Sequence, residues 1–316
     1  MSPTLRLVSA HLLLGGWLLV AGCDERSETP TELYPGVAFA EFRGLPLPLA
    51  APVRLAVLPS GQLLVTDSRR RSVYALDPSG LAVEGGFEVG GKPLGIGARG
   101  GRIFVGNVTR RTVEVYDLKG RIRGHFGADA VGYPIDLAVD DAAALVFVLD
   151  AAALTVRVFD QNGRSLGSIS GPGGGDALLQ SPTGIAVDPA RGEVLVSDYG
   201  PDGGSAAVKI FSYEGDFVDI ISGAGRCGLL GCSGGFSRPQ GLEVDGGGRV
   251  YVTDALLAQV MVFDRVTKQP IATLGGRGMG LRLPLDVALD RDGAVYVTSN
   301  RTGSVELVAV AGGVGP

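Results

Sequence analysis

The chain has 316 residues, 45% of them hydrophobic, and a formal net charge of −5 at pH 7. A net acidic chain argues against general nucleic-acid binding, which needs a surplus of lysine and arginine on one surface. The 51 glycines suit an all-β chain with many turns, because they form neither a collagen period nor a long glycine tract.

The first 22 residues have the pattern of an export signal. Arg6 supplies a positive charge, an apolar core follows, and the segment closes with Val20-Ala-Gly-Cys23. This ending resembles the bacterial lipobox. The resemblance implies cleavage before Cys23 and a diacylglycerol on its sulfur, so that lipid anchors the mature chain on the extracytoplasmic side of the inner or the outer membrane. An ordinary signal peptide with an incidental cysteine, or an uncleaved anchor, is the alternative.

Residues 23–36 are polar and short of apolar side chains, which predicts a flexible tether behind the anchor. Residues 37–316 are then expected to fold as one domain. Removing the leader takes away a single arginine and changes the net charge from −5 to −6.

A proline opens each of six repeating segments in this domain. The six are Pro52, Pro93, Pro134, Pro182, Pro239 and Pro284, at intervals of 41, 41, 48, 57 and 45 residues. In the fifth segment a run from Pro239 to Asp245, a glycine turn, a run from Arg249 to Asp254 and two further runs alternate apolar with small or polar residues, as strands in half-buried sheets do. Four-stranded antiparallel units at this spacing predict an all-β, six-bladed β-propeller.

The strings Pro182-Thr-Gly-Ile-Ala-Val-Asp and Val250-Tyr-Val-Thr-Asp resemble NHL repeats. The resemblance covers residues 37–312 and implies the propeller fold without a particular activity. The chain departs from the family in the loop after the second strand, where the family has Asn and Arg and this chain has, in the first unit, Arg70 and Ser72. No ligand residue is therefore transferred through that loop.

The sixth unit ends after its third strand, and no fourth strand follows it. A strand-like run, Val37-Ala-Phe-Ala-Glu-Phe42, precedes the first proline and belongs to no unit. We expect residues 37 to 44 to supply the missing outer strand, which would close the ring and cover an exposed sheet edge.

Histidine is scarce, since His11 lies in the leader and the mature chain keeps only His125. His125 falls on the outer strand of the second unit, a poor position for a Ser-His-Asp triad. The amidating lyases, which share the NHL-type propeller, hold zinc with several histidines that this chain lacks. The sequence therefore favours a protein without catalysis.

A calcium-dependent lactonase, another hydrolase or a lyase is the alternative, because such a site needs only carboxylates and amides around the axis. The candidates follow the opening prolines closely and are Arg54, Asp136, Glu243 and Asp286. At the channel mouth they could bind a cation or a sugar. They could equally cap the starts of the strands by accepting hydrogen bonds from backbone amides. No cofactor is predicted, and calcium belongs to this alternative alone.

Cys227 and Cys232 remain once Cys23 is assigned to lipid. An exported compartment permits disulfides, and the glycines between the two cysteines let the chain double back. A metal pair would need two further ligands, and a redox pair is usually spaced more closely. A structural disulfide is the favoured interpretation.

Arginines gather in the loops of units six, one and two, which ring closure makes neighbours. They are Arg69, Arg70, Arg71, Arg110, Arg111, Arg277, Arg282 and Arg301. Such a cluster on an acidic protein suits an anionic partner, whether a phosphate-bearing lipid, an envelope polysaccharide or an acidic protein face. Solvated charge paired with Asp67, Asp77 and Asp117 is the alternative.

The loops of the opposite half contain leucine pairs instead, of which Leu229, Leu230, Leu256 and Leu257 have no evident core duty. Exposed together, they would form an apolar patch of the kind that marks a protein interface. Each could also be tucked into its own loop. Together these patterns predict a lipid-anchored, extracytoplasmic propeller that binds a protein or an anionic envelope ligand and no nucleic acid, as a scaffold or sensor.

Overall fold

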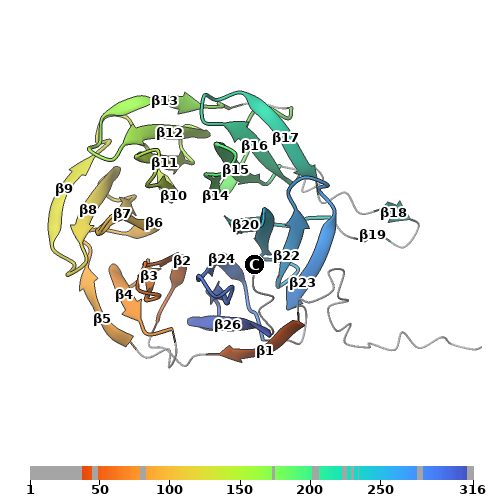
Figure 1. Cartoon of the computed structure of the whole chain (residues 1–316). Coiled ribbons are helices and arrows are strands. Elements are labelled where there is room, and N and C mark those ends of the chain that lie inside the picture. Colours follow the sequence, from red (N-terminus) through yellow and green to blue (C-terminus); the bar gives the residue numbers. More distant parts are fainter. Residues whose placement is uncertain are drawn as a thin grey trace, which may run out of the picture.

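The computed structural model describes residues 38–44, 49–78, 83–172, 175–200, 206–222, 226–228, 231–233, 235–275 and 280–311. Six four-stranded antiparallel sheets surround a central axis, and each innermost strand begins at one of the six repeat prolines (Figure 1). The predicted all-β, six-bladed propeller is confirmed. Within the described ranges, no helix is long and apolar enough to cross a membrane.

Each of the first three blades follows the chain from the axis outward. Blade 1 contains β2 (Pro52–Val57), β3 (Leu63–Asp67), β4 (Ser72–Leu76) and β5 (Val83–Glu88). Blade 2 contains β6 (Pro93–Arg99), β7 (Arg102–Asn107), β8 (Thr112–Asp117) and β9 (Ile122–Phe126). Blade 3 contains β10 (Pro134–Asp140), β11 (Leu145–Asp150), β12 (Thr155–Asp160) and β13 (Ser165–Ile169).

The last three blades complete the ring. Blade 4 contains β14 (Pro182–Asp188), β15 (Glu193–Asp198), β16 (Ala207–Ser212) and β17 (Phe217–Ser222). Blade 5 contains β20 (Pro239–Val244), β21 (Arg249–Asp254), β22 (Gln259–Asp264) and β23 (Pro270–Gly275). Blade 6 contains β24 (Pro284–Leu289), β25 (Val295–Ser299), β26 (Ser304–Ala311) and, as its outer strand, β1 (Ala38–Gly44).

The N-terminal strand closes the ring. β1 pairs antiparallel with β26, so that Ala38 lies opposite Ala311 and Gly44 opposite Glu306. This pairing confirms the predicted closure and removes the exposed edge of the last blade.

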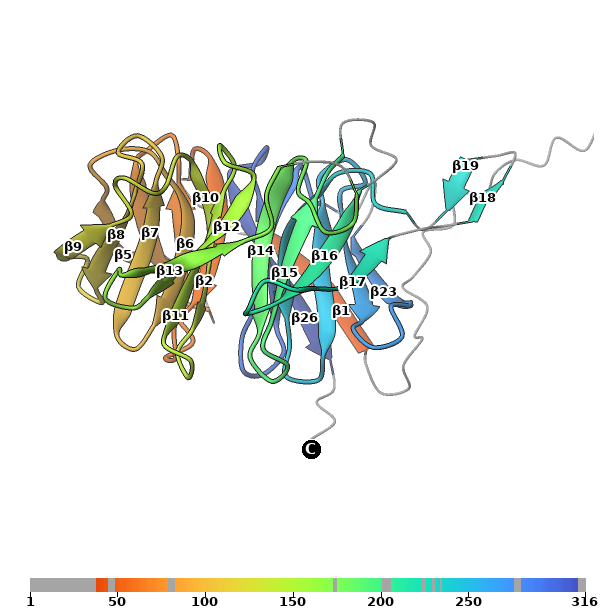
Figure 2. The same ribbon diagram turned by 90° about the horizontal axis from the view of Figure 1, so that it is seen from above.

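A small hairpin, β18 (Arg226–Gly228) with β19 (Gly231–Ser233), interrupts the connection between blades 4 and 5. It lies outside the ring (Figure 2). Its register places the backbone of Cys227 directly opposite that of Cys232.

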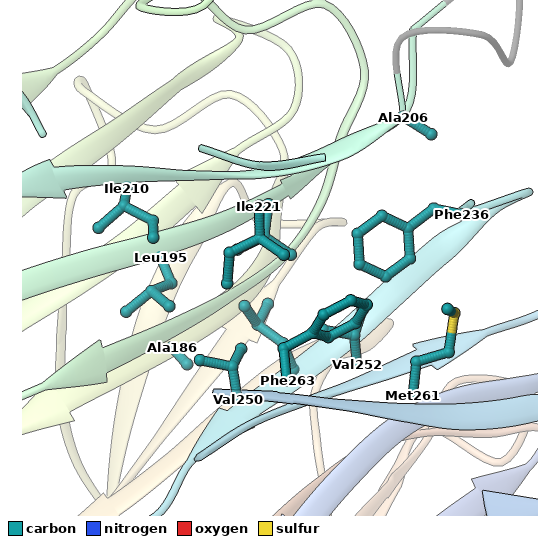
Figure 3. Packing of buried hydrophobic residues seen from close by; sticks show 12 residues of the cluster. Ala186, Leu195, Ala206, Ile210, Ile221, Phe236, Val250, Val252, Met261 and Phe263 are labelled. Carbon is teal, nitrogen blue, oxygen red and sulfur yellow. The ribbon is translucent and has the colours of Figure 1, made fainter. Parts of the chain in front are cut away.

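Apolar clusters fill the spaces between adjacent blades, because alternate residues of each strand face the neighbouring sheet. Between blades 4 and 5, Phe236 and Phe263 pack with their ring centroids 5.2 Å apart, beside Ile221 and Met261 (Figure 3). Phe236 comes three residues before an inner strand. Its counterparts before the other inner strands are also buried, and they are Leu49, Val89, Val131, Leu179 and Leu281.

The aspartate at the end of the second strand has a structural duty. In blade 1, Asp67 accepts hydrogen bonds from the amides of Ala50 and Ala51 before the inner strand, and from those of Arg69 and Arg70 in its own loop. Asp150 and Asp254 repeat the pattern in blades 3 and 5. These carboxylates fix the inter-blade connections and the loops between second and third strands on one side of the ring, which we call the loop face. The turns between first and second strands form the opposite turn face.

Candidate functional site

A backbone irregularity recurs in all six inner strands at the height of the candidate channel residues. The pairing of the first with the second strand shifts register between the opening proline and the second or third residue after it. Such bulges re-aim a side chain. Here they occur where three blades have Arg54, Asp136 and Asp286 and the other three have glycine.

The structure brings Arg54, Asp136 and Asp286 together as one buried cluster, which we call the axial layer. Arg54 Nε lies 3.3 Å from Asp136 Oδ1, and Arg54 Nη1 lies 3.4 Å from Asp286 Oδ1. The guanidinium also donates to the carbonyl of Leu285 at 2.8 Å and to that of Thr183 in blade 4, on the far side of the axis. Arg54 is only 4% exposed. The channel is therefore packed at this height.

The two carboxylates of the layer connect neighbouring blades through backbone amides. Asp136 accepts hydrogen bonds from Leu137 in its own strand at 2.9 Å and from Ile185 in blade 4 at 3.1 Å. Asp286 accepts one from Leu55 in blade 1 at 2.7 Å. The sequence left open that these carboxylates accept hydrogen bonds from backbone amides at the starts of the strands. They do accept such bonds, and most of the donors lie in a neighbouring blade.

Glycine in the other three blades allows close packing at the height of the layer. A Cβ at Gly95 would lie 2.7 Å from Cα of Asp136, and a Cβ at Gly241 would collide with the Asp286 carboxylate and lie 2.8 Å from Arg54 Nη1. A Cβ at Gly184 would collide with the Gln240 carbonyl. Gly241 thus leaves space for the charged side chains, and Gly95 and Gly184 let the backbones of neighbouring inner strands approach closely.

Burial raises the pKa of both aspartates, and it raises that of Asp286 well above the ordinary value. Arg54 opposes the shift at both sites, and the mutual repulsion of the two carboxylates adds to it at Asp286. The layer contains one guanidinium and two carboxyl groups, so its net charge is −1 when both carboxyl groups are ionised.

Glu243 does not join the layer. It lies two residues farther along its strand and lines a cavity of about 170 Å³ below the axial layer, together with residues from the inner strands of all six blades. The cavity extends from Asp136 and Asp286 to the exposed Arg99 and Pro189 at the ends of the inner strands. It therefore faces the turn face, away from the loops that carry the arginines.

A calcium site does not fit these residues. Calcium takes six to eight oxygen ligands, whereas the oxygens of Asp136 and Asp286 already bind Arg54 and backbone amides. In the described part of the chain, no group of three or more histidine, cysteine, aspartate or glutamate residues could hold a metal ion. His125 is exposed on the outer strand β9, where its backbone pairs with that of Glu114.

The predicted arginines lie on the loop face of blades 6, 1 and 2. We call the described ones the arginine arc, and they are Arg69, Arg70, Arg71, Arg110, Arg111, Arg282 and Arg301, all of them exposed. Arg110 binds Glu114 at 2.8 Å, and Arg70 lies 3.4 Å from the Tyr74 hydroxyl. The other five make no side-chain ion pair with any described residue. Arg277 lies outside the described residues.

Two of the three aspartates expected to pair with these arginines, Asp67 and Asp117, are engaged elsewhere. Asp67 is fully buried and accepts backbone amides. Asp117 binds Arg121 at 3.2 Å and Arg123 at 2.6 Å, on the outer part of blade 2. Neither forms an ion pair with a described arginine of the arc.

The leucines and cysteines of the other half are only partly described. Leu256 is 52% exposed, whereas Leu257 packs against the core between blades 4 and 5. Leu229, Leu230 and residues 1–37, which include Cys23, lie outside the described residues.

Two features of the surface were missed by the sequence analysis. Tyr133 is 40% exposed and, with Arg111, lines a groove of about 400 Å³ between the loops of blades 2 and 3. Arg99, at the end of β6, belongs to the channel cavity. Counting from each proline would have placed Arg99 beside the channel, but nothing in the local pattern singles out Tyr133.

The blade arrangement is similar to that of several solved structures. A gluconolactonase from Xanthomonas campestris is 17% identical over 83% of this chain and 86% of its own, with a TM-score of 0.64. A streptogramin B lyase is 13% identical over 89% of this chain and 100% of its own, with a TM-score of 0.60. A chain from a nidogen–laminin complex is 17% identical over 77% and 87%, with a TM-score of 0.62.

At these identities the likeness shows the six-bladed propeller fold alone. No protein-family model and no curated protein matches the sequence. The NHL assignment and the lipidation of Cys23 therefore stay predictions.

Proposed function

We propose that this chain is a lipid-anchored, extracytoplasmic propeller of the bacterial envelope that binds a protein or an anionic envelope ligand through its loop face, as a scaffold or sensor without catalysis. The observation that carries the proposal is the arginine arc. Five exposed arginines, none of them ion-paired with a residue that the structure describes, stand on three adjacent blades of a chain with net charge −5. Guanidinium groups bind phosphate and carboxylate in paired hydrogen bonds.

The groove beside the arc supports a binding surface with some depth. Arg111 provides charge at one wall, and Tyr133 provides an exposed aromatic ring at the other. Arginine and tyrosine are both enriched where protein partners bind most strongly. Leu256, exposed on blade 5, adds an apolar contact on the other side of the same face.

The axial layer supports a function without catalysis. Its carboxylates are satisfied by Arg54 and by amides of neighbouring blades, so they serve to close the ring. The fold by itself is compatible with either function, since the similar structures include a lactonase, a lyase and a partner in a laminin complex.

The anchor and the hairpin complete the proposal. A lipid on Cys23 and the tether of residues 23–36 would hold the propeller at the membrane surface. Cys227 and Cys232 would form a disulfide across β18 and β19, whose register already sets their backbones opposite each other.

Reversing the charge of the arc tests the proposal. A variant with Arg69→Glu, Arg71→Glu and Arg111→Glu should lose its ligand, because an anionic partner would meet repulsion where it met attraction. The immobilised wild-type and variant proteins would be incubated with solubilised envelope, and the retained components quantified by mass spectrometry. Wild-type retention should also fall at high salt.

Arg291 and Arg164 provide the matched control. Both are exposed and lie outside the arc, in the turn between β24 and β25 and before β13. Replacing them with glutamate should leave retention unchanged, and both variants should keep the wild-type stability within about 0.5 kcal/mol. If the arc variant retains the same components as the wild type, the loop face is not the binding surface.

A further inference from the structure

The channel cavity is polar on its walls. Each inner strand is the edge strand of its sheet, so one row of its backbone N–H and C=O groups has no partner strand and faces the axis. The cavity is lined by such edges from all six blades. A ligand that enters it meets hydrogen-bonding groups on every side.

Glu243 differs from the residues at the equivalent position in the other five blades, which are alanine or glycine. The fourth residue after the opening proline is Ala56, Gly97, Ala138, Ala186, Glu243 or Ala288 in blades 1 to 6, and all six line the cavity. Only blade 5 places a charged side chain there. Because the other five blades fold with alanine or glycine at this position, the fold does not require a carboxylate.

The Glu243 carboxylate is free to take a ligand. Among the described residues, only the amide of the next residue, Val244, donates a hydrogen bond to its Oε1, at 3.3 Å. Among the residues that the structure describes, no lysine, arginine or histidine lies within ion-pair distance of it. Arg99, the last residue of β6, also lines the cavity. β6 and β20 face each other across the axis (Figure 1).

The charges that face Glu243 make the cavity acidic. Asp136 from β10 and Asp286 from β24 share the single guanidinium of Arg54, Asp245 after β20 binds Arg249 at 2.5 Å, and Arg99 from β6 is positive. Four carboxyl groups, that of Glu243 included, thus meet three guanidinium groups. Burial raises the pKa of Glu243 to about 7, Asp136 and Asp245 add to the shift, and Arg99 opposes it. A cation placed here would be attracted and would favour the ionised carboxylate.

We propose that the channel cavity binds a small organic cation, a protonated amine with hydroxyl groups, whose ammonium contacts Glu243 while its hydroxyls bond to the strand edges. An organic cation fits better than a metal ion, because a single free carboxylate cannot replace a metal's hydration shell. A cavity of about 150 Å³ holds benzene, so about 170 Å³ suits a molecule of roughly that size. The site is separate from the arginine arc and does not depend on the function proposed for it.

Three probes of equal size and different charge test the proposal. Calorimetric titration of the purified full chain at pH 8 would compare 3-amino-1,2-propanediol, which is cationic, with glycerol, which is neutral, and glycerate, which is anionic. The amine should bind at least tenfold more tightly than glycerol, and glycerate should bind most weakly. Affinity for the amine should fall when the pH is lowered from 8 to 6, because Glu243 then takes up a proton.

Two variants and one control assign the effect to Glu243. Glu243→Gln and Glu243→Ala should reduce the affinity for the amine at least tenfold and leave glycerol unchanged, and the alanine variant has the residue with which other blades fold. Glu214→Gln removes an exposed carboxylate from blade 4 and should change nothing. Equal affinities for the three probes, tighter binding of glycerate, or unchanged amine binding in both Glu243 variants would overturn the proposal.

Discussion

Two heights of the same channel differ in how they are filled. At the axial layer, Arg54, Asp136 and Asp286 occupy the axis and leave it packed, whereas two residues farther along the same strands the axis holds a cavity. The strands, their pairing and their spacing are shared. The difference comes from which side chains meet.

In a ring of six strands, a side chain that reaches the axis needs a missing side chain elsewhere. The axial layer meets this condition at Gly241, which leaves the space that the Asp286 carboxylate and Arg54 take, whereas Gly95 and Gly184 allow close approach of the neighbouring inner strand. At the height of Glu243 the other five residues are also small, and Arg99, the cation that faces it from blade 2, forms no ion pair with it among the described residues. A buried carboxylate that forms an ion pair stabilises the fold, as in the axial layer, whereas one without an ion pair can bind a ligand.

The largest expected effect on stability comes from removing the positive charge of Arg54 from the axial layer. Arg54→Met should lower the free energy of unfolding by about 3–5 kcal/mol, because two buried carboxyl groups lose their counter-ion. Chemical denaturation followed by far-UV circular dichroism would measure this free energy of unfolding.

The same variant with Asp136→Asn and Asp286→Asn gives the control. Neutral amides no longer repel each other, so this triple variant should be more stable than Arg54→Met alone. If the triple variant is no more stable, the loss at Arg54 is one of packing and not of charge.

An added methyl group tests whether the layer depends on its glycines. Gly241→Ala should cost about 1–3 kcal/mol, because the new Cβ collides with Asp286 and crowds Arg54. Gly124→Ala in the outer strand β9 is the matched control, since a Cβ there meets no atom within 4 Å. Equal melting temperatures for the two variants would show that the axis is looser than described.

The smallest expected effect on stability comes from Glu243 in the channel cavity, and it depends on pH. The pKa of Glu243 rises from 4.5 to about 7 on folding. Between these values the folded chain binds the extra proton, so its stability is full below about pH 4.5 and falls as the pH rises to 7. Because the Glu243 side chain is only partly buried, solvent weakens this effect, and we expect a loss of about 1 kcal/mol.

Glu243→Gln isolates this contribution from that of the axial aspartates, whose raised pKa values act in the same direction. The free energies of unfolding of variant and wild type would be compared at pH 5 and pH 8. Relative to the wild type, the variant should have a higher free energy of unfolding at pH 8 than at pH 5. The same difference between the two proteins at both pH values would contradict the raised pKa of Glu243.

The sequence predicted the strand pattern well because each blade is a local unit. Period-two alternation and the six prolines located every inner strand, and the count of strands in the sixth unit identified the closing strand β1. The candidate site was predicted as a set of residues at equivalent positions. That Arg54 contacts blades 3, 4 and 6 could not be predicted, because its partners lie up to 232 residues away in the chain.

The repeat by itself determined the number of blades, their order around the axis and the sector in which the arginines gather, since these follow from periodic burial and ring closure. Tertiary structure decided how the charges are used. It turned Asp136 and Asp286 inward onto Arg54, fixed Asp67 to backbone amides so that it forms no ion pair with a described arginine of the arc, and left Glu243 facing the other opening of the channel. The reason is physical: burial and pairing of a charge depend on neighbours from other blades, which the sequence of one blade does not contain.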